Sequence, residues 1–320
     1  MAKNIPMVAA LLLLMGSSAV ADEKYPSRDI HLINPTPAGS GSDIVTRWLA
    51  ERIKKASGQT VIVENKPGAG ALLATEYTAR AKPDGYTILM AAGNNLAANQ
   101  TVLKNPPIDV RSQIVVAGTL NRQAITIAVR ADRPWKTLPE LTRYLKERGQ
   151  KATYGASTVA SRILGELYQS KADLNGVQVV YQTSNAMLNE IQSGHLDFVV
   201  VDSIFASKQH RDGKLRVLGV STPTRMNAMP DFPTMKESGY DISFMAWFGL
   251  FVPSATPGPV VSQINKWLGE IMTTEEAKTF VQDVIGGDPM VTSPDQANEL
   301  LRQDVKDWVG YVDLAKIERM

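Results

Sequence analysis

Short apolar runs alternate with segments of helical periodicity along most of the chain. Runs at 30–34, 60–65 and 86–92 have the length of strands. The intervening segment 43–56 places its apolar residues on one helical face and is followed by Gly58, a residue typical of helix ends. Because neighbouring parallel strands need a helical crossover between them, this alternation predicts βαβ units and a parallel sheet.

The same alternation continues through the middle of the chain and predicts a second α/β set. Further strands are expected within 113–130 (two runs) and at 151–157, 177–182, 196–201, 214–221 and 243–253, and further helices at 71–81, 137–149, 158–171, 185–193 and in the last residues. Strand-like runs near 124–130 and 243–253 flank the middle set. This arrangement predicts an α/β protein of two lobes, in which the chain crosses to the second lobe and returns.

The predicted boundaries follow from these crossings. Lobe 1 is expected to comprise residues 22–124 and 246–320, and lobe 2 residues 125–245. The crossing strands would form a hinge, and the cleft between the lobes is the expected ligand site.

The first 21 residues have the features of a cleavable secretory signal. Lys3 is followed by an apolar stretch at 7–15 and by the small-residue pattern Ala19-Val20-Ala21. The apolar stretch is shorter than the roughly 20 residues that span a bilayer. We therefore predict cleavage after Ala21 and a periplasmic location; the alternative is a buried N-terminal helix.

Composition excludes several classes of function. The 320 residues carry a net charge of +2 without a polybasic run, so neither nucleic acid nor an anionic membrane is an expected partner. Cysteine is absent, which excludes disulfides and thiol catalysis. None of the three histidines (His31, His195, His210) stands in a metal-binding or catalytic motif. We expect no catalytic residue, metal or cofactor.

Four turns share one form, in which small polar residues lie between a strand and a helix. They are "PTPAGSGSD" (35–43), "AGNNLAANQ" (92–100), "YGASTVASR" (154–162) and "YQTSNAM" (181–187). A helix start has unpaired N–H groups and a partial positive charge, so several such turns around one cleft could bind carboxylates. The predicted ligand-binding residues are Thr36, Ala38, Gly39, Ser40, Gly41, Ser42, Asn94, Asn95, Ser157, Thr158, Ser161, Arg162, Thr183, Ser184 and Asp202.

Ser40 and Asp43 have the spacing of a capping box. Asp43 would then be structural, and the N–H groups of Gly39 to Ser42 would face outward. Ser161, in the first turn of its helix, is expected to reach a bound oxygen with its hydroxyl, and Arg162 to pair with a second carboxylate or remain solvated. The alternative at each turn is helix capping alone.

These motifs resemble those of the Bug-type periplasmic solute receptors, the binding subunits of tripartite tricarboxylate transporters. The matching stretches include "VENKPGAG" followed by "AKPDGYT", together with "GKLRVLGVSTPTR" and "AWFGLFVPSATP". The resemblance implies a two-lobed Venus-flytrap fold, of the type II-like periplasmic binding protein class, that closes on a small carboxylate. It implies that the turns at 35–43 and 155–161 clamp one carboxylate, largely through backbone N–H groups.

The chain departs from the usual family pattern at several of these positions. The family often has an aromatic where Thr36 stands, a second glycine at Ser40, a histidine at Arg162 and Lys-Gly-Gly at 182–184. These departures leave the identity of the ligand open. The expected function is capture of a small organic acid (a mono-, di- or aromatic carboxylate) by a monomer that delivers it to integral membrane transporter subunits. The alternatives are a sensor for a membrane signalling partner and a secreted enzyme acting on a carboxylated metabolite.

Overall fold

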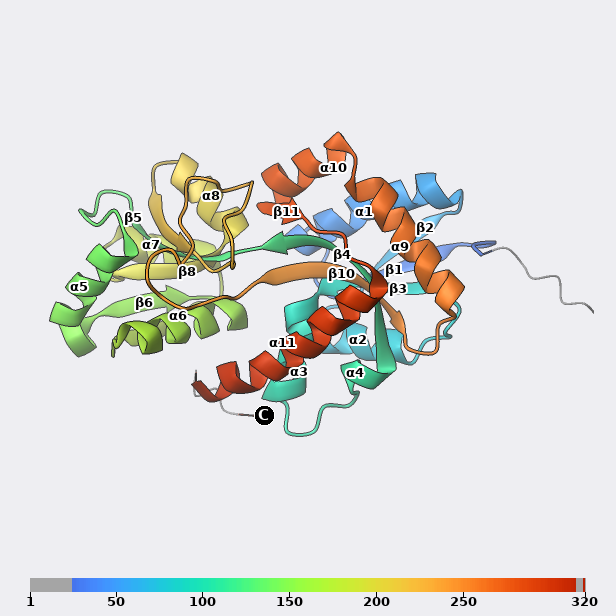
Figure 1. Cartoon of the computed structure of the whole chain (residues 1–320), viewed down its shortest axis with the longest axis horizontal. Coiled ribbons are helices and arrows are strands. Elements are labelled where there is room, and N and C mark those ends of the chain that lie inside the picture. Colours follow the sequence, from blue (N-terminus) through green and yellow to red (C-terminus); the bar gives the residue numbers. More distant parts are fainter. Residues whose placement is uncertain (1–24, 315–318, 320) are drawn as a thin grey trace, which may run out of the picture.

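The computed structural model describes residues 25–314 and residue 319, so the expected signal peptide lies outside the described residues. Figure 1 shows two lobes side by side, each built on a sheet with helices packed against it. Among the described residues there is no helix with the length and apolar character needed to cross a membrane.

The first lobe is built on a six-stranded sheet in the order β11-β4-β10-β3-β1-β2. β1 is parallel to β2 and β3, whereas β10 is antiparallel to both β3 and β4. Its elements are β1 (Ile30–Asn34), α1 (Gly41–Ser57), β2 (Val61–Asn65), η1 (Ala69–Ala71), α2 (Leu72–Ala79), β3 (Thr87–Ala92), α3 (Gly93–Val102), α4 (Val110–Gln113), β4 (Ile114–Gln123), β10 (Ala246–Pro253), α9 (Gly258–Met272), α10 (Glu275–Phe280), η3 (Val281–Ile285), β11 (Gly287–Pro289) and α11 (Pro294–Leu314).

The second lobe is built on a five-stranded sheet in the order β7-β6-β8-β5-β9. β6 is parallel to β7 and β8, and β5 is antiparallel to β8 and β9. Its elements are β5 (Ile125–Arg130), α5 (Leu138–Arg148), η2 (Gly149–Lys151), β6 (Thr153–Ala156), α6 (Val159–Ala172), β7 (Val177–Val180), α7 (Ser184–Gln192), β8 (Phe198–Asp202), α8 (Ser203–Arg211) and β9 (Leu215–Val220).

The lobes also share a hydrophobic core. One buried cluster contains Trp247 of the first sheet, Leu164 of α6, and Val305 and Trp308 of α11. α11 contacts α3 in the first lobe and α6 in the second, and Figure 1 shows it extending from the first lobe toward the second. The two lobes are therefore connected by packing as well as by the crossing chain.

The α/β architecture of two sheets agrees with the sequence analysis, and most elements begin and end within a few residues of their predicted bounds. Several elements were not predicted, namely α4, α8, β11 and the short helices η1, η2 and η3, and α3 occupies most of the stretch 92–100 that was expected to form a turn. α8 follows the apolar strand β8 without a turn, so "DSIFAS" reads as a continuation of a strand. β11 has three residues and owes its strand conformation to pairing with β4.

Candidate functional site

The carboxyl ends of the parallel strands of both lobes meet at the crossover from β4 to β5. β4 runs in the same direction as β1 and β3, since β10 is antiparallel to both β3 and β4. In the second lobe the first residue of β5, Ile125, lies beside Asp202, the last residue of β8. Ala124 alone separates β4 from β5. The starts of α1, α3, α6, α7 and α8 therefore converge on this crossover.

The turn before α1 is held by bonds among its own side chains. Ser40 is the N-cap, and its hydroxyl oxygen accepts from the Asp43 N–H at 3.3 Å. Its hydroxyl also lies 2.6 Å from that of Thr36. Ala38 and Gly39 are exposed, and Gly39 has a φ of +80°, a conformation that glycine adopts without strain.

Asp43 is structural, as expected, but its contacts differ from those of a capping box. Its Oδ2 accepts from the Gly39 N–H at 2.9 Å and lies 2.9 Å from Arg47 Nε, while its Oδ1 accepts from Asn65 at 2.8 Å. Hydrogen bonding from Arg47 and Asn65 lowers the pKa of Asp43 to about 2. The carboxylate therefore remains charged and rigidly held at neutral pH.

These contacts correct the prediction that the N–H groups of Gly39 to Ser42 all face outward. The Gly39 N–H points to Asp43 and the Ser40 N–H donates to the carbonyl of Pro37 at 3.2 Å, so neither faces outward. The N–H groups of Gly41 and Ser42, at the first two positions of α1, have no acceptor in the part of the chain that the structure describes. They are the donors that this turn can offer to an anion.

The turn before α6 is also capped internally. Ser161 is 2% exposed, and its hydroxyl oxygen accepts from the N–H groups of Ser157 (3.2 Å) and Thr158 (2.9 Å). Thr158 in turn caps the Ser161 N–H at 3.1 Å. Ser161 therefore occupies a capping box rather than presenting its hydroxyl to a ligand, contrary to expectation. In this turn the N–H groups of Val159 and Ala160 have no acceptor among the described residues.

Arg162 is directed along the sheet rather than into the convergence. Its Nε donates to Gln178 Oε1 at 3.0 Å. Gln178 lies opposite Tyr154, two residues before the carboxyl end of β6. This position does not fit a salt bridge to a ligand between the helix starts.

The remaining predicted residues also lie at helix starts. Thr183 caps α7, and the Ser184 hydroxyl lies 3.1 Å from that of Ser157, which joins the α6 and α7 turns. Asp202 caps α8 through the Phe205 N–H at 2.9 Å, and burial raises the pKa of this carboxyl.

α3 differs from the other helices because its N-cap, Ala92, has no side chain to bond the first turn. Asn94 is buried and Asn95 exposed. Neither side chain makes a hydrogen bond within the described residues.

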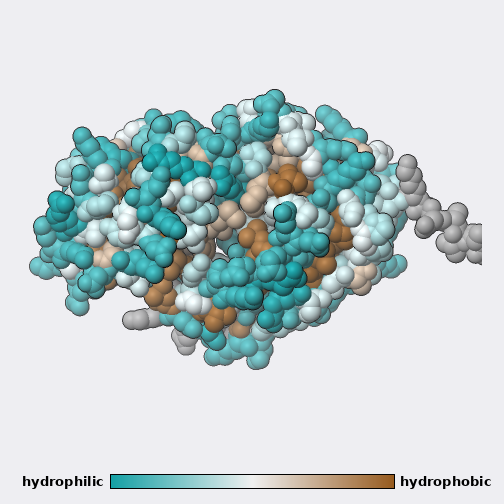
Figure 2. Space-filling model, in the orientation of Figure 1, coloured by the Kyte–Doolittle hydropathy of each residue, from teal (hydrophilic) through white to brown (hydrophobic). Residues whose placement is uncertain are grey.

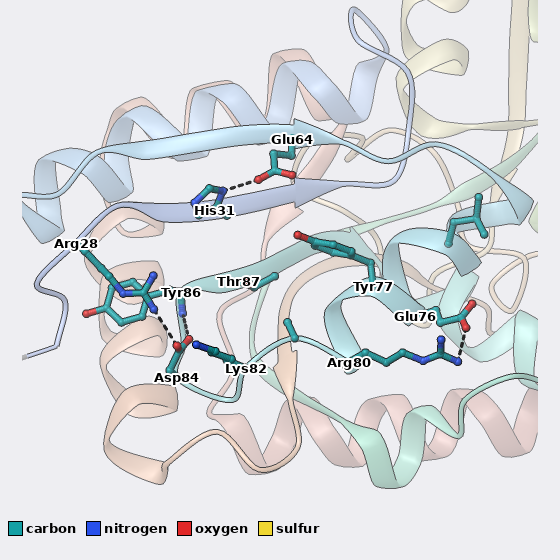
Figure 3. A pocket seen from close by; sticks show the side chains of 12 residues that line it. Arg28, His31, Glu64, Glu76, Tyr77, Arg80, Lys82, Asp84, Tyr86 and Thr87 are labelled. Carbon is teal, nitrogen blue, oxygen red and sulfur yellow. Dashed lines mark hydrogen bonds and ion pairs between the residues drawn. The ribbon is translucent and has the colours of Figure 1, made fainter.

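A wide groove of the described surface lies elsewhere. A groove of about 890 Å³ runs beside α2 and includes His31 and Thr87, at the amino ends of β1 and β3. Figure 3 shows that its charged side chains face one another in pairs, such as Arg28 with Asp84 and His31 with Glu64. Because the groove lies beside α2 and its lining includes none of the helix starts at the crossover, we do not assign the ligand site there.

Ionisable groups give no support for catalysis or metal binding at the site. Among the described residues no group of three or more histidine, aspartate or glutamate side chains is placed to hold a metal ion. The neighbourhood of the crossover is instead built from hydroxyls, amides and backbone donors. Figure 2 shows a mostly hydrophilic surface on this face, with hydrophobic residues visible around the junction of the lobes.

Sequence comparison identifies relatives that span most of the chain. The model of the "Tripartite tricarboxylate transporter family receptor" (TctC) matches residues 45–314. A UPF0065 protein of Bordetella pertussis is 32% identical over 261 residues, covering 81% of this chain and 80% of that protein. Protein BugT of the same organism is 25% identical over 320 residues, covering 98% and 97%.

Solved structures share the fold. The periplasmic binding protein BugD has a TM-score of 0.75 and 28% identity, covering 92% of this chain and 100% of that one. R. palustris Rpa4515 with adipate has a TM-score of 0.78 at 22% identity, covering 91% and 98%. MatC from Rhodopseudomonas palustris with bound malate has 0.73 at 22% identity, covering 90% and 100%. The matched family consists of receptors rather than enzymes, in agreement with the sequence analysis.

Proposed function

The chain belongs to the tripartite tricarboxylate transporter receptor family, and on that premise we propose that it captures a small organic carboxylate at the β4–β5 crossover and delivers it to membrane transporter subunits. Structures with the same fold contain adipate and malate, which are both carboxylates. The receptor would act as a monomer in the periplasm after cleavage behind Ala21, and the intact mass of the secreted protein would test that site.

One observation carries the assignment of the site. The N–H groups of Gly41 and Ser42 in one lobe, and of Val159 and Ala160 in the other, lie at helix starts that converge and have no acceptor among the described residues. Such groups bind an anion through hydrogen bonds and the helix dipole, without a cationic side chain. A carboxylate between the two helix starts would satisfy donors from both lobes at once.

The ligand can be found by thermal shift across a panel of carboxylates. A ligand that binds only the folded state stabilises it by RT ln(1 + [L]/Kd), about 2.7 kcal/mol at a hundredfold excess over Kd. Calorimetry on each hit would then give the affinity. Conversion of the hit into a product by the purified protein would contradict the receptor assignment.

Gly41→Pro tests the backbone donors directly. Proline is favoured at the first position of a helix, where it removes an N–H that has no intrahelical partner. The preceding residue, Ser40, is already extended (φ −72°, ψ 164°), as a residue before proline requires. A hydrogen bond to a charged group contributes about 1.5–3 kcal/mol, so we expect the affinity to fall roughly 10- to 100-fold with little change in stability.

Gly41→Ala is the matched control, because it keeps the N–H and an added Cβ would meet no atom within 4 Å. Its affinity should remain close to that of the original protein. Equal affinities for the proline and alanine variants would show that the Gly41 N–H does not bind the carboxylate.

A further inference from the structure

Asp202 is the one acidic side chain among the predicted site residues. It is the last residue of β8, its neighbour across the sheet is Ile125 at the crossover, and the residue is only partly exposed to solvent. Oδ1 accepts from the Phe205 N–H at 2.9 Å. No ion pair to Asp202 occurs within the described residues, so a negative charge here is not neutralised by a nearby cation.

The cations beside the converging strand ends are engaged by other groups. Arg122, the residue before the last of β4, bonds Asp288 at 2.8 Å. Arg47 bonds Asp43 at 2.9 Å, and Lys66, just after β2, lies 3.2 Å from Glu64. Arg162 bonds Gln178 along β7. The described residues that converge on the crossover therefore offer backbone donors for one carboxylate but no cation directed at a second one.

Several other groups at the convergence are neutral. The hydroxyls of Ser157 and Ser184 lie 3.1 Å apart, and the side chains of Asn94 and Asn95 have no hydrogen-bond partner in the described chain. The first turn of α3 also lacks a side-chain cap. These donors could serve a hydroxyl oxygen or a carboxylate, so the distinction between the two depends on charge. A carboxylate removed from water beside Asp202 would require one of the two groups to take up a proton.

We propose that the ligand is a monocarboxylate whose far end is uncharged and polar, as in a hydroxy acid, and that Asp202 excludes a second ligand carboxylate. This inference rests on the proposed function, because it concerns the other end of a molecule whose first carboxylate the helix starts bind. The receptor thereby rejects dicarboxylates of the same length. The second carboxylate of such a ligand would be repelled by the charge of Asp202 and would lose its hydration without gaining a cationic partner.

Length-matched pairs of acids provide the test. Each pair differs only in replacement of a terminal hydroxymethyl group by a carboxylate: 3-hydroxypropanoate and malonate, 4-hydroxybutyrate and succinate, 6-hydroxyhexanoate and adipate, and 4-(hydroxymethyl)benzoate and terephthalate. Calorimetry at pH 7.5 should show the hydroxy acid of the best-fitting pair binding roughly tenfold or more tightly than its partner, since an unpaired buried charge is costly.

Asp202→Asn should remove this preference. Asparagine caps a helix as well as aspartate does, so α8 keeps its start. We expect the dicarboxylate to gain at least about tenfold in affinity while the hydroxy acid changes by less than about threefold. Asp202→Ser, a second capping residue, provides the same test if the asparagine variant does not fold. Asp212→Asn, at the opposite end of α8, removes an equal charge and should leave the preference unchanged.

The outcomes separate this inference from the proposed function. Equal or tighter binding of the dicarboxylate by the unmodified protein overturns the inference while leaving carboxylate capture intact. The same is true if both Asp202 variants keep the original preference. If no acid of any pair binds, carboxylate capture itself is contradicted.

Discussion

The hydrogen bond between Trp247 and Asp304 places an acidic group beside β10, one of the two strands that we expect to act as a hinge. Trp247 Nε1 donates to Asp304 Oδ2 at 2.7 Å, and Trp247 is 1% exposed. The carboxyl lies in a cavity of about 170 Å³ that also contains Met245, in the segment that leads back to the first lobe. Burial raises the pKa of Asp304 from 3.8 to about 7, the nearby charge of Asp307 adds to this, and the Trp247 hydrogen bond opposes it.

The direction of the stability change follows from this shift. Because the folded protein holds the Asp304 proton up to about pH 7 and the unfolded chain releases it near 3.8, the fold binds more protons than the unfolded chain between these values. Stability is therefore lost as the pH rises through this range. A pKa difference of about three, at 1.36 kcal/mol for each tenfold change in proton affinity, would correspond to about 4 kcal/mol of unfolding free energy. The group is half-buried, so solvent screening lowers the effect and we expect about 2 kcal/mol.

Asp304→Asn tests this reasoning. The asparagine Oδ1 can still accept from Trp247, while the group no longer titrates. Urea unfolding at pH 5 and pH 8 should show the variant gaining about 2 kcal/mol relative to the original protein as the pH rises. Asp313→Asn, an exposed position on the same helix, is the control and should follow the pH dependence of the original protein. Parallel curves for Asp304→Asn and the original protein would refute the assignment of a raised pKa.

Two further predictions concern contacts between the lobes. Asp288 is 2% exposed, bonds Arg122 at 2.8 Å and accepts from the N–H groups of residues 227 and 228, so Asp288→Ala should lower the free energy of unfolding by about 3–5 kcal/mol. Asp288→Asn keeps an acceptor for the N–H groups and should lower it less. Equal losses for the two variants in urea unfolding would contradict this prediction. Gly286 (φ +63°) and Gly213 (φ +68°) both disfavour alanine, but only at Gly286 would the Cβ meet backbone, Ile204 Cα at 2.8 Å. Gly286→Ala should therefore cost about 1–3 kcal/mol more than Gly213→Ala, and equal shifts in the unfolding midpoint would refute the close approach.

Local patterns predicted the fold because the determinants of each element lie close together in the sequence. Apolar runs separated by glycine-bearing turns fix the strands of both sheets, and the single residue between β4 and β5 places the crossover where two such runs adjoin. α8 was missed because its identity depends on Asp202 ending one element and capping the next. β11 was missed because only pairing with a distant strand holds three residues extended.

The candidate site was predictable as a set of helix starts but not in its hydrogen bonds. The spacing of Ser40 and Asp43 indicated a cap, yet Asp43 is oriented by Asn65, 22 residues away. This orientation captures the Gly39 N–H and leaves the next two donors available. In the same way Arg162 is drawn aside by Gln178 on a neighbouring strand. The backbone N–H groups that remain free to bind a ligand therefore depend on contacts between residues far apart in the sequence, which local patterns do not predict.

The packing between the lobes limits how the receptor can close. α11 joins both lobes through a shared core, and Asp288 accepts hydrogen bonds from the N–H groups of residues 227 and 228 in the loop after β9. A large rotation would therefore expose apolar surface and break hydrogen bonds to a buried carboxylate. The two turns that we propose to bind the carboxylate lie beside the crossover, where such a rotation would move atoms least. A ligand can shift the balance of conformations only by its difference in affinity between them. Donors supplied by both lobes provide that difference, because a carboxylate satisfies all of them only when the helix starts approach each other.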